Sequence, residues 1–84
     1  MILLPTEQVI GILLAEGFTR DDSVQYGYAG YKWDGEWMVI DEKYAKQDID
    51  HLIQDSVVSE HYKLADKLST IRDDIIKKHN LSKK

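Results

Sequence analysis

Apolar residues near the N-terminus recur at the spacing of an amphipathic helix. The stripe consists of Val9, Ile10, Leu13 and Leu14. Pro5 precedes the stripe, Glu7 places an acid at the positive end of the helix dipole, and Gly17 offers a left-handed stop. We therefore predict a first helix over residues 6–16. Because Ile12 lies outside the stripe, we expect this helix to be covered on more than one side.

The pattern becomes typical of β-strands between residues 24 and 41, where aromatic and β-branched side chains are frequent. Asp34 and Gly35 divide this stretch, and this dipeptide favours a two-residue type I′ hairpin turn. The expected cross-strand pairs are Trp33 with Glu36, Lys32 with Trp37, Tyr31 with Met38, Gly30 with Val39, Ala29 with Ile40 and Tyr28 with Asp41. Alternatively, Gly27 or Gly30 breaks the first run, and a turn near Ala29-Gly30 gives a three-strand meander.

Alternation along the paired strands gives the hairpin two apolar faces. One face carries Ala29, Tyr31, Trp33, Met38 and Ile40, and the other carries Tyr26, Tyr28, Trp37 and Val39. A small sheet packs one face on helices, and a second apolar face then needs a cover. The first helix and a partner protein are the two candidates for that cover. Residues 20–23 are polar and are predicted to form the turn that precedes the hairpin.

From Asp48 onward the apolar residues return to a helical period. Residues 49–53 predict a short helix and residues 57–79 predict a longer one, with Ser56 as the cap between them. The seam of the longer helix consists of Val57, His61, Leu64, Leu68, Ile71 and Ile75. Asn80 is expected to end this helix, and residues 81–84 are expected to be a frayed basic tail.

The length of the second predicted helix raises the question of oligomerisation. At 1.5 Å per residue it would span about 35 Å, which is more than a short hairpin and one helix can cover. Self-association would hide the excess of the seam, and a twofold pair is the commonest arrangement. The candidate contact between two copies consists of Leu64, Leu68, Ile71 and Ile75.

These elements predict an α+β fold: a helix, an antiparallel hairpin or three-strand meander, and then a short and a long helix. The chain has 84 residues, of which 43% are hydrophobic and 31% charged, so we expect a single domain over residues 1–80. It contains no cysteine, which excludes disulfides and thiolate metal sites and agrees with a cytoplasmic location. The apolar start has no preceding Lys or Arg and is interrupted by Pro5, so neither export nor a membrane span is expected.

The charges are divided unevenly between the two parts of the chain. Residues 1–60 carry 12 acids and 4 bases, whereas residues 61–84 carry 3 acids and 7 bases. Most of the acidic excess consists of Asp34, Glu36, Asp41, Glu42, Asp48, Asp50, Asp55 and Glu60. This acidic belt should attract basic surfaces and repel phosphate.

A second group of titratable residues combines acids with a histidine. It consists of Asp48, Asp50, His51 and Asp55. His51 and Asp55 are four residues apart and share one side of a helix, which is half of a metal site. A transition metal needs three or four convergent ligands, and the chain has no second spaced His pair, so we expect neither a metal nor another cofactor.

No arrangement typical of an enzyme is evident. Nucleophile elbows, phosphate loops and calcium-loop spacings are absent from the sequence. The neighbouring carboxylates Asp21-Asp22 and Asp73-Asp74 cannot converge on one substrate. His61 lies on the apolar seam, where a packed histidine is more typical than a proton-transfer group. We therefore expect a protein that is not an enzyme.

The aromatic hairpin and the acidic belt together predict a small acidic protein-binding module, an inhibitor or regulator that occupies a basic surface of a partner protein. The predicted binding residues are Tyr26, Tyr28, Trp37, Val39, Asp34, Glu36, Asp41 and Glu42. By analogy, such inhibitors include accessory proteins of phages and other mobile elements that block nucleic-acid-handling grooves.

The alternative hypothesis is a dimeric nucleic-acid-binding regulator that uses the basic C-terminal helix on phosphates. Its candidate residues are Lys63, Lys67, Arg72, Lys77, Lys78, Lys83 and Lys84. Only two bases, Lys32 and Lys43, lie near the aromatic hairpin in the sequence. Single-strand binders place Lys and Arg around their stacking residues, so the charge layout favours a protein partner.

Overall fold

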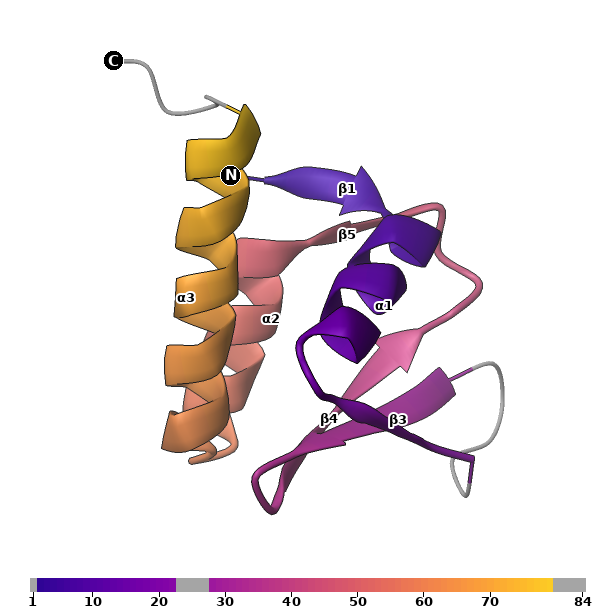
Figure 1. The fold of residues 1–84 in the computed structure, drawn as a ribbon. Coiled ribbons are helices and arrows are strands. Elements are labelled where there is room, and N and C mark those ends of the chain that lie inside the picture. The colour runs from indigo at the N-terminus through magenta and orange to yellow at the C-terminus, as the bar shows by residue number, and fades with distance from the viewer. Residues whose placement is uncertain (1, 23–27, 80–84) are drawn as a thin grey trace.

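A computed structural model describes residues 2–22 and 28–79, and it has the predicted α+β fold, with helices beside antiparallel sheets (Figure 1). The elements in chain order are β1 (Leu3–Pro5), α1 (Thr6–Ala15), β2 (Thr19–Asp21), β3 (Tyr28–Trp33), β4 (Glu36–Asp41), β5 (Lys46–Asp48), α2 (Ile49–Val58) and α3 (Tyr62–His79). Strands β2, β3 and β4 form one sheet, and β1 pairs with β5 in a second, smaller sheet.

Helix α1 agrees with its prediction to within one residue. Gly17 adopts a φ of +97°, which is the left-handed conformation that ends the helix. Its start is held by Thr6, whose amide donates to the Ala45 carbonyl at 3.1 Å and whose hydroxyl donates to the Tyr44 carbonyl at 2.7 Å. Leu14 is exposed although the stripe included it, whereas Ile12, which lies outside the stripe, is partly buried against the core, as expected.

The β3–β4 hairpin has the predicted register at all six pairs, from Trp33–Glu36 to Tyr28–Asp41. Asp34 and Gly35 have φ values of 51° and 81°, and two positive values define the type I′ turn. The alternative turn near Ala29-Gly30 is wrong, because both residues lie inside β3 and are buried.

The sheet nevertheless has three strands, and the third is β2. It occupies the first half of the segment that was predicted to be a polar turn, and it pairs Arg20 with Tyr31. That prediction was wrong because the pairing partner, rather than local apolar alternation, makes this segment a strand. Ser23 and Tyr26 lie outside the described residues.

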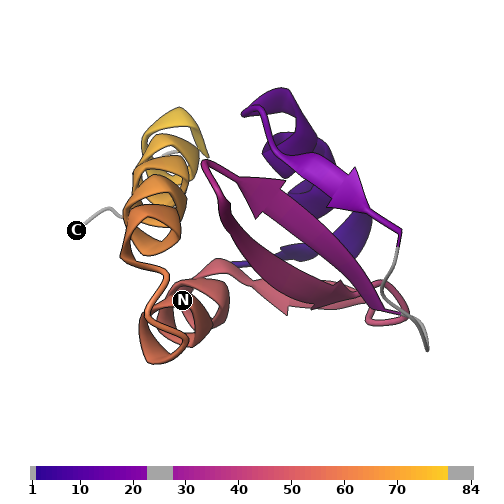
Figure 2. The ribbon, with the colours of Figure 1, turned by 90° about the horizontal axis from the view of Figure 1, so that it is seen from below.

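One face of this sheet packs against α1. Tyr31 from β3 and Met38 from β4 are buried in the same cluster as Val9 and Leu13 of α1. Figure 2, which views the molecule from below, shows α1 behind the sheet and no described helix in front of it. The first helix is therefore not the cover of the second face of the hairpin.

The second sheet joins the N-terminus to the start of α2, and the sequence did not predict it. Leu3 pairs with Asp48 and Pro5 with Lys46, and the Ile49 amide donates to the Ile2 carbonyl at 3.0 Å. Strands of three residues carry too little alternation to be recognised, and these partners are more than 40 residues apart in the chain.

The break between α2 and α3 lies further along the chain than predicted. Ser56 is not a cap: it is buried inside α2, and its hydroxyl donates to the Leu52 carbonyl at 3.0 Å. The chain turns instead at residues 59–61, where Glu60 has a φ of 62°. The cap of α3 comes from β4, because Glu36 Oε1 accepts a hydrogen bond from the Leu64 amide at 2.6 Å.

Helix α3 consequently has 18 residues and is about 27 Å long rather than 35 Å. Four of its side chains are buried in the core with exposed fractions between 0% and 5%: Leu64, Leu68, Ile71 and Ile75. The predicted contact between two copies through these residues is wrong, since α1 and α2 cover them within one protomer. Within the described ranges, no helix combines the length and apolar character that crossing a membrane requires. Asn80 and the predicted tail lie outside those ranges.

Candidate protein-binding surface

The second face of the hairpin is open to solvent. Tyr28, Trp37 and Val39 have exposed fractions of 46%, 51% and 38%, whereas the alternate residues Met38 and Ile40 are buried. Val39 pairs with Gly30, which has no side chain, so no cross-strand side chain covers it. Three of the four apolar residues predicted for this face are therefore exposed together, and the fourth, Tyr26, is not described.

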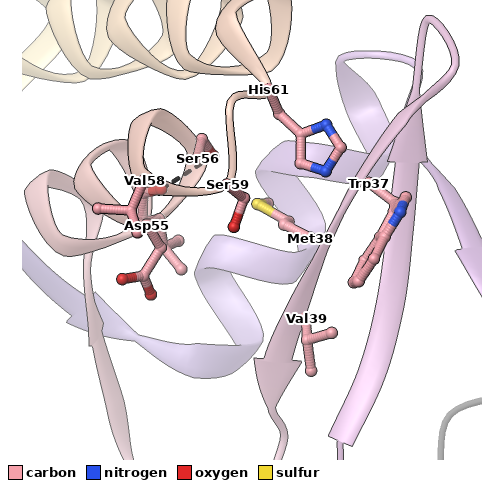
Figure 3. A pocket seen from close by; sticks show the side chains of 9 residues that line it. Trp37, Met38, Val39, Asp55, Ser56, Val58, Ser59 and His61 are labelled. Atoms are coloured by element: carbon pink, nitrogen blue, oxygen red, sulfur yellow. Dashed lines mark hydrogen bonds between the residues drawn. The ribbon is translucent and has the colours of Figure 1, made fainter.

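A groove runs beside this face, between β4 and α2 (Figure 3). We call it the β4–α2 groove. Its strand wall consists of Trp37, Met38 and Val39. Its helix wall and the turn that follows consist of Leu52, Asp55, Ser56, Val58, Ser59 and His61. The groove has a volume of about 440 Å³, which is within the range of roughly 300–1,000 Å³ that is usual for binding sites.

The helix wall extends the apolar surface beyond what the sequence predicted. Val58 is the most exposed large apolar side chain in the described residues, at 75%, and Val57 beside it is also exposed. The prediction placed both at the start of the long helix, with Val57 on its buried seam. No local signal marked them, because their exposure depends on where α2 ends and on which elements pack against it.

His61 lies in the turn before α3 rather than on a helical seam. Its ring contacts the Trp37 ring, with the centroids 5.7 Å apart and the planes at 57°. Asp55 is oriented away from it in Figure 3 and forms an ion pair with His51 instead, at 3.5 Å. Among the described residues, no hydrogen bond links His61 with Asp55 or with the Ser56 hydroxyl, which is bonded to Leu52. The groove thus contains no assembled nucleophile and base.

The members of the Asp48–Asp55 cluster have separate structural roles. Asp48 caps α2 by accepting a hydrogen bond from the Asp50 amide at 3.0 Å. Asp50 in turn pairs with Arg72 of α3, which ties the two helices together. In the part of the chain that is described, no three metal-ligating side chains converge.

Two of the predicted binding acids are engaged inside the protein. Glu36 caps α3, as described above, and Glu42 accepts hydrogen bonds from Arg20 Nη2 at 3.1 Å and from the Tyr31 hydroxyl at 2.9 Å. Their part in the predicted binding surface stays a prediction, and these internal hydrogen bonds give both carboxylates a structural role as well. The sequence did not indicate these roles, because Leu64, Arg20 and Tyr31 are remote in the chain from the acids that they contact.

The hydrogen bonds of Glu42 with Arg20 and Tyr31 also shift the pKa values of Glu42 and Tyr31. The hydrogen bond from Arg20, together with that from Tyr31, lowers the pKa of Glu42. Burial of the Tyr31 ring, assisted by its hydrogen bond to Glu42, raises the pKa of Tyr31. The hydroxyl therefore remains protonated and donates, and the arrangement links β2, β3 and the end of β4.

The other acids of the belt remain nearer to solvent. Asp34 at the hairpin tip lies 3.7 Å from Lys63, and this pair is largely exposed. Asp41 accepts a hydrogen bond from the Lys43 amide at 2.9 Å. Asp55 lines the groove itself, and the lining contains no Lys or Arg. Asp55 is therefore the one acid of the belt that shares the groove lining with Trp37.

The basic residues of the alternative hypothesis are partly engaged within the protein. Lys67 donates to Glu16 at 2.9 Å and lies 5.6 Å from the centroid of the Trp33 ring. Arg72 is bonded to Asp50, and Lys63 is near Asp34. Lys77 and Lys78 are exposed, while Lys83 and Lys84 lie outside the described residues.

Comparisons with protein families, curated proteins and solved structures find no match to this chain. The geometry and charge of the surface are consequently the only guides to its function.

Proposed function

We propose that this chain is a non-enzymatic protein-binding module, an inhibitor or regulator that occupies a basic surface of a partner protein. The observation that carries the proposal is the half-exposed Trp37, which lies between an open apolar sheet face and the β4–α2 groove. Tyr28 and Val39 extend the same surface across the two strands.

Burial of these side chains by a partner would contribute substantially to binding. A Trp side chain buries about 200 Å², so covering the exposed half of Trp37 corresponds to roughly 2.5 kcal/mol at ~25 cal/mol per Å². Aromatic residues at the centre of an interface are typical hot spots.

Charge determines the kind of partner that we propose. Asp55 lines the groove, Asp41 follows Val39 at the end of β4, and Asp34 at the hairpin tip is paired with Lys63; the groove lining has no Lys or Arg. A complementary partner presents apolar pockets edged with Lys or Arg, which would guide the encounter and select against acidic proteins. A groove that handles nucleic acid is one such surface, and its blockage by an accessory protein of a mobile element remains an analogy.

Capture of partners from a host lysate tests this proposal. The full-length chain is immobilised as wild type, Trp37→Ala, Tyr28→Ala and Tyr44→Ala. Tyr44 is also an exposed aromatic residue, but it does not line the groove, so Tyr44→Ala is the matched control. We expect at least a tenfold loss of a salt-sensitive captured protein for Trp37→Ala and a smaller loss for Tyr28→Ala, with no loss for Tyr44→Ala. Equal capture by all four proteins would overturn the proposal.

A further inference from the structure

Strand β4 is an edge strand. The sheet order is β2, β3, β4, so among the described strands β4 has a neighbour on one side only. The type I′ turn joins the Trp33 carbonyl to the Glu36 amide, which makes Trp33–Glu36 a hydrogen-bonded pair. Because such pairs alternate along an antiparallel ladder, residues 36, 38 and 40 direct their backbone groups toward β3. Trp37, Val39 and Asp41 therefore direct theirs toward the free edge.

The hydrogen bonds of Asp41 agree with this alternation. Its carbonyl accepts from the Tyr44 amide at 3.2 Å and from Gln47 Nε2 at 3.3 Å, both outside the β3–β4 ladder. Trp37 and Val39 have no such partner among the described residues. Two amides and two carbonyls are consequently available in a row along the edge.

The β4–α2 groove follows this edge. Trp37, Met38 and Val39 are consecutive, and their side chains alternate between the two faces of the sheet. All three can line one groove only if it runs along the edge of the strand. The facing wall is formed by α2, so the groove has the layout in which an extended peptide lies between a strand and a helix.

We propose that an extended basic segment of the partner protein binds in the β4–α2 groove as an additional strand on the free edge of β4. This inference rests on the proposed function and adds the mode of binding to it. The backbone of the segment bonds to Trp37 and Val39, and its side chains alternate between the open sheet face and α2. Asp55 on the helix wall and Asp41 at the end of β4 favour Lys or Arg in the segment, since the lining itself has no Lys or Arg.

A proline at position 39 separates this mode from simple surface contact. Val39→Pro removes the Val39 amide, which is one of the two donors on the free edge. It leaves the ladder with β3 intact because that amide points away from β3. Val39→Ala keeps the donor and loses the side chain. We expect capture of the partner to fall at least tenfold for Val39→Pro and by a several-fold smaller factor for Val39→Ala, which loses only side-chain contacts. Equal capture by the two variants would overturn strand addition.

The outcomes distinguish this inference from the proposed function. If Trp37→Ala abolishes capture while Val39→Pro does not, the protein-binding surface stands and strand addition fails. If none of these variants changes capture, the proposed function fails as well.

A defined peptide probe keeps the inference testable if Val39→Pro does not fold. The probe is a capped hexapeptide of alternating Lys and Val, compared with alternating Glu and Val and with the fully N-methylated Lys-Val peptide. We expect the Lys-Val peptide to shift the amide resonances of Trp37 and Val39 saturably and to slow their hydrogen exchange. Binding of either control peptide should be at least tenfold weaker. The Glu-Val peptide carries negative instead of positive charges, and the N-methylated peptide lacks the backbone donors.

Three results of this experiment would overturn the inference. The first is binding that is unaffected by N-methylation, and the second is the absence of any shift at positions 37 and 39. The third is protection of these two amides in the protein alone that increases with its concentration, since the edge would then be occupied by a second copy of the chain.

Discussion

The two faces of the β3–β4 hairpin are similar in composition and differ in their surroundings. Tyr31, Met38 and Ile40 on one face are buried, whereas Tyr28, Trp37 and Val39 on the other are exposed. An aromatic residue and aliphatic residues occur on both, so apolar character alone does not distinguish them. Apolar character indicates that a face needs to be covered. The rest of the fold determines which of the two faces is covered by other parts of the same chain.

The connection between α1 and β2 provides a physical reason for the choice. Only Glu16, Gly17 and Phe18 separate the helix from the strand, so α1 must return directly over the sheet. Phe18 is buried, and its ring stacks on Trp33 with the centroids 6.2 Å apart. Since Trp33 belongs to the same face as Tyr31, this contact places the helix on that face.

The strongest test of this difference is a pair of truncations in β4. Ile40→Ala removes buried methyl groups and leaves a cavity, so we expect a loss of about 2–5 kcal/mol in the free energy of unfolding. Val39→Ala, one residue earlier on the open face, should cost less than about 0.5 kcal/mol. Urea denaturation measures both. Similar losses at the two positions would show that the open face is covered.

The contact from β4 to α3 should have an intermediate effect. Glu36→Ala removes the carboxylate that accepts from the Leu64 amide, and the loss of a helix cap costs roughly 1 kcal/mol. Glu36→Gln retains an acceptor oxygen and should cost less. Unfolding in urea, together with hydrogen exchange of the Leu64 amide, would check this. An unchanged exchange rate in Glu36→Ala would contradict the assigned cap.

The far end of β4 should make stability depend on pH. The pKa of Glu42 is lowered in the folded protein by Arg20 and Tyr31, so its contribution is present above the pKa of the unfolded chain. It is lost as the pH falls through the lower folded value. We therefore expect the free energy of unfolding to fall less steeply between about pH 5 and pH 3 in Glu42→Gln than in the wild type. Identical slopes would exclude this role for Glu42.

Tyr31 provides the corresponding test at alkaline pH. Its pKa is raised, mainly by burial, so the unfolded chain releases this proton before the folded protein does. The stabilising contribution is complete below the unfolded pKa and declines as the pH rises through the folded one. Tyr31→Phe should remove this part of the decline in the free energy of unfolding at alkaline pH. Tryptophan fluorescence would follow the unfolding of both proteins. The same decline in both proteins would argue against it.

The smallest effect on stability is expected on the open face itself. Trp37→Ala removes a half-exposed ring and should change the free energy of unfolding by less than about 1 kcal/mol, although it removes most of the capture proposed above. Circular dichroism and urea unfolding provide the measurement. A large destabilisation would mean that the Trp37–His61 contact is part of the core.

Local patterns were sufficient for the elements whose signals lie within a few residues. The stripe around Val9 and Leu13 with Gly17 behind it identified α1. Asp34-Gly35 determined every pair of the β3–β4 hairpin, because a two-residue turn leaves only one register. The two apolar faces followed from that register alone.

Features that depend on remote partners could not be obtained in this way. Strands β1 and β5 form by pairing with each other, and β2 forms by pairing with β3. None of the three has a recognisable pattern of its own. The break between α2 and α3 was misplaced because Ser56 resembles a cap, while the actual cap is Glu36 on a distant strand. The acids of the belt have equal charges in the sequence and unequal roles in the fold.

The sequence by itself determined that this chain has an α+β fold with a two-faced aromatic hairpin and an excess of acids in its first 60 residues. Only the tertiary structure decided which face of that hairpin is open, that Glu36 and Glu42 are structural, and that α2 lines a groove along the edge of β4. The physical reason is that periodicity and turn chemistry act between neighbours in the chain. Burial and pairing act between elements that meet only after folding.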